Sequence, residues 1–248
     1  MGIRRGNQNF IGGIKDGLVL YYDATSSFVS SSYGVNPSNW NSIAGNSLTF
    51  QNSPVYTGSI GGNVTFNKNL NQNAYHSGGN IVLTNATMIL WGKYFTTQSG
   101  VYVGTLFSSC DNSNYDYASG FCLYWAYYVP GLIFESSVAG GGYSNAYNYI
   151  SSSTTFSANT WYHITFTIDS SWITCYLNGI QQKRLFRSNN SNSQIYLNTF
   201  CIGSRCQGTS YFFDYCTGSV AQAMIYNRAL SSSEVVSLYS GSKGRFGL

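Results

Sequence analysis

Two consecutive stretches, residues 162–168 and 172–177, alternate apolar side chains with polar or aromatic ones. Their apolar residues stand at every second position: Ile164, Phe166 and Ile168, then Ile173, Cys175 and Leu177. A period of two places one row of side chains in a core and the other on a solvated face or against a second layer. The two stretches are therefore predicted to be neighbouring strands of a sheet with one side packed into the interior.

Turn residues flank these strands. Asp169-Ser-Ser171 lies between them, and Asn178-Gly179 follows the second one. Asn-Gly supplies the two positive-φ positions that a type I′ hairpin turn needs. Together with a third strand at residues 180–185, the pattern predicts a meander of three antiparallel strands.

The rest of the chain shows short apolar stretches separated by turn-rich loops, without alternation of strands and helices. We expect strands at residues 18–22, 48–50, 63–66, 87–95, 106–107, 120–125, 131–134 and 219–226. Residues 87–95 are apolar on both faces, as in a central strand between two layers. One short helix is predicted after Ser231, which forms a capping box with Glu234.

The predicted fold class is thus all-β: a jelly-roll sandwich of two antiparallel sheets with one short C-terminal helix. No internal repeat or proline-rich linker divides the 248 residues, which include only three prolines. We expect an N-terminal arm at residues 1–16, with Phe10 and Ile11 as its apolar anchors, and one domain at residues 17–248. The first residues lack the apolar core of a secretory signal, and no apolar run reaches membrane-spanning length, so synthesis in the cytosol and no membrane partner are expected.

Composition narrows the range of ligands. Charged residues make up 8% of the chain and the formal net charge is +4. The basic residues are scattered, with small clusters at Arg4-Arg5 and around Lys183-Arg184, so nucleic acid is not expected as a ligand. A weakly charged surface rich in tyrosine and asparagine suits packing against neighbouring proteins, including further copies of this chain.

Six cysteines show no Cys-x-x-Cys spacing, so a zinc site is not expected. Cys122 and Cys175 occupy apolar strand positions and are interpreted as small core residues. Cys201, Cys206 and Cys216 flank one loop, and whether any of them pair stays open.

Several motifs, in this order, are similar to those of the concanavalin A-like lectin/glucanase superfamily in its laminin-G-like branch. They lie at residues 17–24, 161–169, 175–179, 203, 218–220 and 225–234. The closing Lys243-Gly-Arg-Phe-Gly247 is similar to the tail of laminin-G-like domains in virion proteins of large tailed phages. The resemblance covers residues 17 to about 240. It implies a sandwich of two curved sheets, whose concave face or rim loops bind glycans in some members.

The acidic residues do not favour an enzyme. Glucanases that share this fold use a pair of carboxylates a few ångströms apart. The chain has only two glutamates, Glu135 and Glu234, and neither has an acidic residue two or three positions away. His163 lies in a strand beside Thr165, where a structural role is expected. No catalytic residue is assigned. A pair of carboxylates could still form on folding from two of the three residues Asp111, Asp116 and Asp214.

Calcium and sugar sites are the remaining candidates. The resemblance implies a rim site for calcium, with oxygen ligands from Asp111, Asp116 and Asp214, but Asp and Asn favour loops in any case. No cofactor is assigned and calcium is left open. Aromatic residues in or beside loops are candidates to stack on sugar rings, although abundant aromatics also serve cores and interfaces. They are Trp125, Tyr127, Tyr128, Tyr211, Phe212 and Phe213.

The function expected from sequence is a non-enzymatic virion surface protein, a capsid decoration or head-fibre component. Capsid or other virion proteins would be its partners, its location would be the virion surface, and neither calcium nor a glycan would be needed. The alternative is a lectin that attaches to host-surface glycans. A glycosidase on the glucanase fold is the third candidate.

Overall fold

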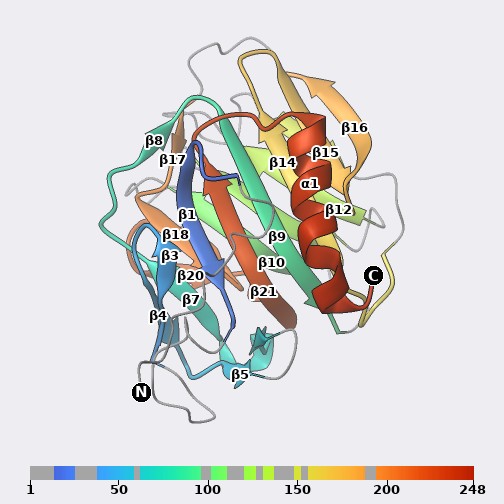
Figure 1. Ribbon diagram of the computed structural model, residues 1–248. Coiled ribbons are helices and arrows are strands. Elements are labelled where there is room, and N and C mark those ends of the chain that lie inside the picture. Colours follow the sequence, from blue (N-terminus) through green and yellow to red (C-terminus); the bar gives the residue numbers. More distant parts are fainter. Residues whose placement is uncertain are drawn as a thin grey trace, which may run out of the picture.

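A computed structural model describes residues 14–25, 38–58, 62–95, 102–110, 120–126, 131–136, 148–151, 156–187 and 194–248. It consists of two large antiparallel sheets packed face to face, with one helix on the outside (Figure 1). The predicted sandwich of two antiparallel sheets with a C-terminal helix is therefore confirmed. The expected arm falls mostly outside the described residues.

The first sheet has nine strands. Along its main path these are β16 (Ile180–Phe186), β15 (Trp172–Leu177), β14 (Tyr162–Ile168), β9 (Ala86–Tyr94), β21 (Gly218–Tyr226), β1 (Leu18–Asp23) and β3 (Ser42–Ala44). Two short strands, β6 (Asn63–Phe66) and β5 (Val55–Thr57), continue from β21. As predicted, β9 is central and buried on both faces. The predicted meander β14–β15–β16 is confirmed, and it forms one end of this path.

The second sheet has eight strands. In order they are β13 (Asn148–Ser151), β12 (Gly131–Ser136), β11 (Phe121–Ala126), β10 (Tyr102–Cys110), β18 (Thr199–Ile202), β7 (Asn73–His76), β4 (Leu48–Gln51) and β2 (Asn39–Trp40). Two small pairs lie outside both sheets: β8 (Val82–Leu83) with β17 (Ile195–Tyr196), and β19 (Arg205–Gln207) with β20 (Tyr211–Phe213). A short 3₁₀-helix, η1 (Lys68–Leu70), precedes β7.

The main core fills the space between the two sheets. Large aromatic side chains meet there, including Phe66, Phe107, Phe166 and Phe200, all at most 1% exposed. The ring of Phe107 stands edge-on to that of Phe200, with centroids 4.7 Å apart. Dense burial of aromatic surface of this kind is the main stabilising term for a sandwich.

A second apolar layer covers the outer face of the nine-stranded sheet. The helix α1 (Ser232–Ser242) crosses this face in front of β14 and β15 (Figure 1). Val235 and Leu238 of the helix pack on Ile89, Tyr176 and other outward-facing strand residues. The row that contains His163, Thr165 and Thr167 is therefore buried too, because it faces this second layer and not solvent.

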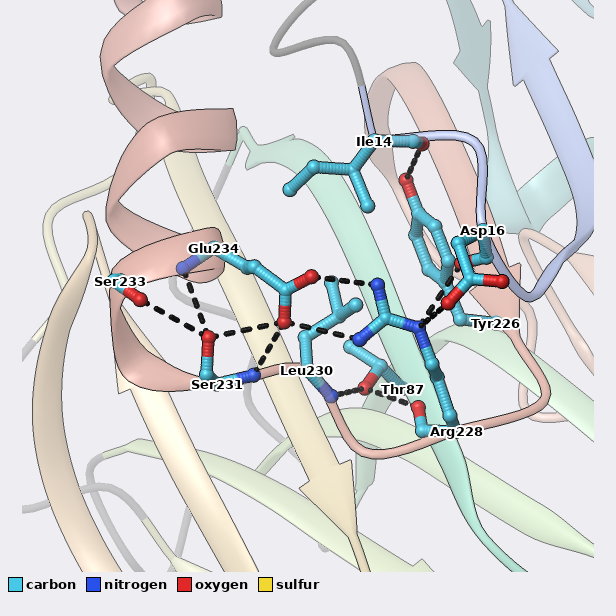
Figure 2. Close-up of polar contacts among 9 residues, drawn as sticks. All are labelled: Ile14, Asp16, Thr87, Tyr226, Arg228, Leu230, Ser231, Ser233 and Glu234. Carbon is cyan, nitrogen blue, oxygen red and sulfur yellow. Dashed lines mark hydrogen bonds and ion pairs between the residues drawn. The ribbon is translucent and has the colours of Figure 1, made fainter.

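The predicted capping box at the start of α1 is confirmed. The Ser231 side chain accepts from the backbone N–H of Glu234, whose carboxylate accepts from the backbone N–H of Ser231. Figure 2 shows Arg228 between Glu234 and Asp16, with nitrogen–oxygen distances of 2.6 and 3.1 Å. One arginine thus ties the start of the helix to the segment that precedes β1.

The 3₁₀-helix η2 (Lys243–Phe246) continues from α1 and closes the chain against the sheet. Phe246 stacks on the fully buried Trp91 with ring centroids 4.1 Å apart. Arg245 forms an ion pair with Asp23 of β1 at 2.8 Å. None of the described helices has the length and apolar character needed to cross a membrane.

The Asn178-Gly179 turn has the predicted conformation, with φ of 50° at Asn178 and 77° at Gly179. We expect Gly179→Val to lower the free energy of unfolding by about 1–3 kcal/mol, because a β-branched residue is strained at positive φ. A Cβ there would also lie 3.0 Å from the Tyr239 ring of α1. Thermal melts should show a clearly lower Tm, whereas Gly78→Val, also at positive φ but in open space, isolates the backbone strain. An unchanged Tm for Gly179→Val would contradict this role of the turn.

Candidate functional site

The candidate site lies on the outer face of the eight-stranded sheet. Four residues in register point away from the core there, because their strand neighbours Phe107, Phe200, Leu123 and Ala74 belong to the core. This outward row consists of Cys122, Ser108, Cys201 and Tyr75, on β11, β10, β18 and β7.

The hairpin β19–β20 covers part of this row. Phe212 packs on Tyr75 with ring centroids 4.8 Å apart. The Ser108 hydroxyl donates to the Ser204 carbonyl at 2.9 Å and accepts from the Cys206 backbone N–H at 3.2 Å. The hairpin is therefore fixed on the sheet by its inward-facing residues, and its other face is turned away from the sheet.

That other face carries an aromatic pair. Because side chains alternate along a strand, Tyr211 and Phe213 point opposite to Phe212. Tyr211 is 60% exposed, and its ring centroid lies 5.6 Å from that of Phe213 at an interplanar angle of 35°. Two rings at this spacing offer an apolar surface with a phenol hydroxyl at its edge, suited to a ligand that has both apolar and polar faces.

Charged groups adjoin the aromatic pair. The Arg205 guanidinium lies 5.6 Å from the Phe213 ring centroid, and its Nη1 is 3.9 Å from the Asp214 carboxylate. Asp214 has a φ of 49°, an uncommon conformation for a residue with a side chain, and its carbonyl accepts from the Thr105 backbone N–H at 2.8 Å. This hydrogen bond anchors the end of the hairpin to β10.

The close approach of this segment to β10 requires a glycine. Gly104 has a φ of 119°, and a Cβ on it would lie 2.5 Å from the Cα atom of Cys216. Any larger residue would push residues 215 and 216 away from β10. The position of Asp214 and of the aromatic pair thus depends on Gly104.

The sequence-predicted sugar-binding residues separate in the structure. Tyr211 lies on the exposed face of the hairpin, whereas Phe212 faces the sheet. Phe213, which the sequence also gave as a stacking candidate, is the ring beside Tyr211. Trp125 lies in β11, and its side chain, like all of Tyr127 and Tyr128, lies outside the described residues.

Of the three predicted calcium ligands, the structure describes only Asp214. Asp111 and Asp116 fall outside the described residues, and Asp214 lies beside the cationic Arg205. Within the described part of the chain no group of three His, Cys, Asp or Glu side chains could hold a metal ion. Calcium binding at Asp111, Asp116 and Asp214 stays a prediction.

Two of the residues considered for catalysis, Glu234 and His163, are held in structural contacts away from the candidate site. Glu234 is held by the helix cap and by Arg228, and this hydrogen bond from Arg228 lowers its pKa to about 2. Glu135 lies in β12, and its side chain is outside the described residues. His163 is 1% exposed and packs against the rings of both Trp91 and Tyr239, which also stack on each other. Burial lowers its pKa to about 3.

A second exposed aromatic group was missed by the sequence reasoning. At the β15–β16 pair, Trp172 lies edge-on to Phe186, which is 59% exposed. The guanidinium of Arg184 lies 4.2 Å from a Trp172 ring centroid. The available signal was the strand alternation, which places Trp172, Arg184 and Phe186 on one face of the β15–β16 hairpin.

The chain belongs to the concanavalin A-like lectin/glucanases superfamily, whose family model matches residues 67–236. No curated protein matches the sequence. The match confirms the predicted membership of this superfamily, whereas the similarity of the C-terminal tail to phage virion proteins stays a prediction.

Solved structures with this fold include domain 4 of AbnA, an extracellular arabinanase from Geobacillus stearothermophilus, in complex with arabinotriose. It is 17% identical with a TM-score of 0.55, over 90% of this chain and 98% of that one. The binding domain of botulinum neurotoxin DC in complex with SialylT has 13% identity and a TM-score of 0.64. The match covers 92% of this chain and about half, 51%, of that one. A SAP-like pentraxin from Limulus polyphemus is 19% identical with a TM-score of 0.51, over 66% and 73% of the two chains.

Proposed function

We propose that this protein is a non-catalytic glycan-binding domain, and that the outward face of the β19–β20 hairpin is its sugar site. The observation that carries the proposal is the exposed Tyr211 ring beside Phe213, next to the partly exposed Asp214 carboxylate, which the buried Arg205 adjoins. A sugar ring has an apolar face that stacks on aromatic rings and hydroxyls that can donate to a carboxylate.

Two of the structural neighbours support the class of ligand. Domain 4 of the arabinanase was solved with arabinotriose, and the toxin binding domain with SialylT. Identities below 20% carry the fold alone, so the choice of sugar for this chain rests on its own hairpin. The second aromatic group, at Trp172 and Phe186, is the alternative position for the sugar site within the same domain.

Sequence alone placed a virion surface role first and glycan binding second, and glycan binding is now placed first. The virion-surface role, with capsid proteins as partners and a virion location, stays a prediction that no comparison supports. A glycan-binding domain can also serve on a particle surface, so the two roles are compatible. The glycan site is placed first because it rests on a defined set of side chains.

The test is an array of arabino-oligosaccharides and sialylated oligosaccharides, followed by calorimetry on the glycans that bind. We expect Tyr211→Ala to weaken binding at least tenfold, a loss of about 1.4 kcal/mol, because the exposed half of the platform is removed. Tyr211→Phe should retain most of the affinity, since the ring that stacks remains.

Trp172→Ala is the matched control, because it removes a partly buried aromatic side chain from the other group and should leave binding unchanged. Absence of binding by the parent protein to every oligosaccharide would contradict the proposed function. Binding that survives Tyr211→Ala but is lost in Trp172→Ala would move the site to the β15–β16 hairpin.

A further inference from the structure

Three cysteines from separate strands meet beneath the β19–β20 hairpin. Cys110 comes from β10, Cys201 from β18 and Cys206 from β19, and together they form one buried cluster. All three are at most 6% exposed, and Tyr75 and Phe212 pack around them. Of the three cysteines that flank one loop in the sequence, Cys216 is not a member, because it lies in the main core between the sheets.

The register of the sheet fixes the relation between Cys110 and Cys201. Thr199 is opposite Cys110 and Ser108 is opposite Cys201, so the two cysteines are diagonal neighbours on adjacent antiparallel strands. Diagonal residues lie roughly 7–8 Å apart, whereas disulfides join Cα atoms about 4.4–6.8 Å apart. A disulfide between Cys110 and Cys201 is therefore disfavoured, because the pairing of β10 with β18 holds them too far apart.

Cys206 lies beside both, since the three side chains form one buried cluster. Its thiol donates to the carbonyl of Thr199, the residue opposite Cys110, at 3.7 Å. Cys206 lies on the hairpin, outside the ladder, so a small movement of β19 can bring it to either neighbour. The Ser108 hydroxyl oxygen also lies 3.5 Å from the Cys206 sulfur.

The surroundings also distinguish Cys206 as the reactive thiol. Burial alone would raise its pKa, but hydrogen bonds from Cys110, Cys201 and Ser108 and the charge of Arg205 lower it below the usual value. For Cys201, burial and the bond to Cys206 raise the pKa. The thiolate is the form that attacks a disulfide. Cys206 is the expected nucleophile because, of the three cysteines, it is the one carried by the β19–β20 hairpin, outside the ladder of the eight-stranded sheet.

We propose that Cys206 is a thiol–disulfide exchange site that forms one intrachain disulfide, with either Cys201 or Cys110, and so fastens the β19–β20 hairpin to the eight-stranded sheet. The oxidant is a small disulfide such as oxidised glutathione. The Cys206 thiolate attacks one of its sulfurs, forming a mixed disulfide and releasing one glutathione thiolate. The thiolate of Cys201 or Cys110 then attacks the Cys206 sulfur and releases the second glutathione. The protein loses two thiol hydrogens and two electrons, and the oxidant becomes two thiols.

Because the three sulfurs are buried, the exchange requires the hairpin to lift from the sheet. Short outer elements of this kind open locally at much lower free energy than the core. The two products differ in loop length, since Cys110 and Cys206 enclose a far longer stretch of chain than Cys201 and Cys206. The longer loop should raise the Tm more, because it restricts the unfolded chain more strongly.

The experiment equilibrates the full chain with oxidised and reduced glutathione, quenches it with acid and an alkylating agent, and maps its peptides by mass spectrometry. We expect an intact-mass loss of about 2 Da, the two hydrogens removed, and linked peptides that contain Cys206 with Cys201 or Cys110. Cys201→Ala should form only the Cys110–Cys206 bond, with the larger rise in Tm, and Cys110→Ala only the Cys201–Cys206 bond.

Cys206→Ala should form neither bond, and Cys216→Ala, which removes a buried cysteine outside the cluster, should oxidise as the parent does. Three outcomes would overturn the proposal: a parent chain that stays fully reduced in oxidised glutathione, a disulfide that joins any cysteine outside the cluster, or persistent disulfide formation in Cys206→Ala. The parent peptide map decides the matter even if a variant fails to fold.

Discussion

Replacing Arg245 by Met is expected to lower the free energy of unfolding by about 3–5 kcal/mol. Nη1 of Arg245 donates to both carboxylate oxygens of Asp23, at 2.8 and 2.9 Å, and Nη2 donates to the Gly62 carbonyl at 3.0 Å. Asp23 is 3% exposed, so the variant would leave a buried carboxylate without its cation. Loss of one partner of a buried ion pair is far more destabilising than loss of a surface pair.

The groups around Asp23 cannot replace the charge of Arg245. The side-chain amide of Gln222 donates at 2.6 Å and the Tyr21 hydroxyl at 3.0 Å. Burial and the nearby Asp23 charge raise the pKa of Tyr21, so it stays protonated and donates a neutral hydrogen bond. These bonds orient the carboxylate, but they supply only dipoles.

Urea denaturation of Arg245→Met, Asp23→Asn and the double variant would measure the coupling free energy between Arg245 and Asp23. The double variant should recover part of the loss, because no buried charge is left uncompensated. Arg184→Met is the matched control: Arg184 lies exposed on the Trp172 ring, and its replacement should change stability by less than about 0.5 kcal/mol. A loss below about 1 kcal/mol for Arg245→Met would contradict the role assigned to the pair.

Local signals in the sequence were sufficient for much of the fold. Continuous apolar character on both faces identified β9 as a central strand, and Asn178-Gly179 specified the β15–β16 turn. The capping box at Ser231 identified the start of α1. Each of these signals lies within a few residues of the structure that it specifies, so no knowledge of the tertiary fold was needed.

The contacts between distant segments could not be predicted in the same way. Asp23 and Arg245 are 222 positions apart, and Ser108 and Cys206 are 98 positions apart. Sequence alone placed Phe212 and Phe213 in or beside loops, whereas they lie in strand β20 and point to its opposite faces. Which face meets the sheet depends on how the β19–β20 hairpin folds over Tyr75, which only the three-dimensional structure provides.

The second layer on the nine-stranded sheet explains why His163 is buried. Its strand pattern was compatible with a solvated face or with a second layer, and the position of α1 decides for the latter. The backbone of His163 is fixed by Asn178, whose side-chain oxygen accepts from its N–H at 2.9 Å. The imidazole is therefore held against Trp91 and Tyr239, buried from the solvent that would favour its charged form.

Acidification should therefore destabilise the protein through His163. Its pKa is lowered from 6.5 to about 3 in the folded chain, so between these values the unfolded state binds the proton and the folded state does not. The contribution of the neutral His163 side chain to the free energy of unfolding is fully present above pH 6.5 and is lost as the pH falls toward 3. Linkage gives a slope of about 1.4 kcal/mol per pH unit, or about 2 kcal/mol between pH 6.5 and 5.

Urea denaturation at pH 7, 6 and 5 would measure this slope. His163→Phe keeps a ring packed against Trp91 and Tyr239 but cannot titrate, so its free energy of unfolding should be nearly constant over this range, whatever its value at pH 7. His76→Gln is the control, because His76 is less buried and bonds to Asn46 at 2.9 Å, and its replacement should leave most of the slope. The carboxylate of Glu234 does not interfere, since its folded pKa of about 2 and its unfolded value of 4.5 both lie below the range. An equal slope in the parent and in His163→Phe would show that the proton is taken up elsewhere, and His163 would then not be the acid-sensitive group of the second layer.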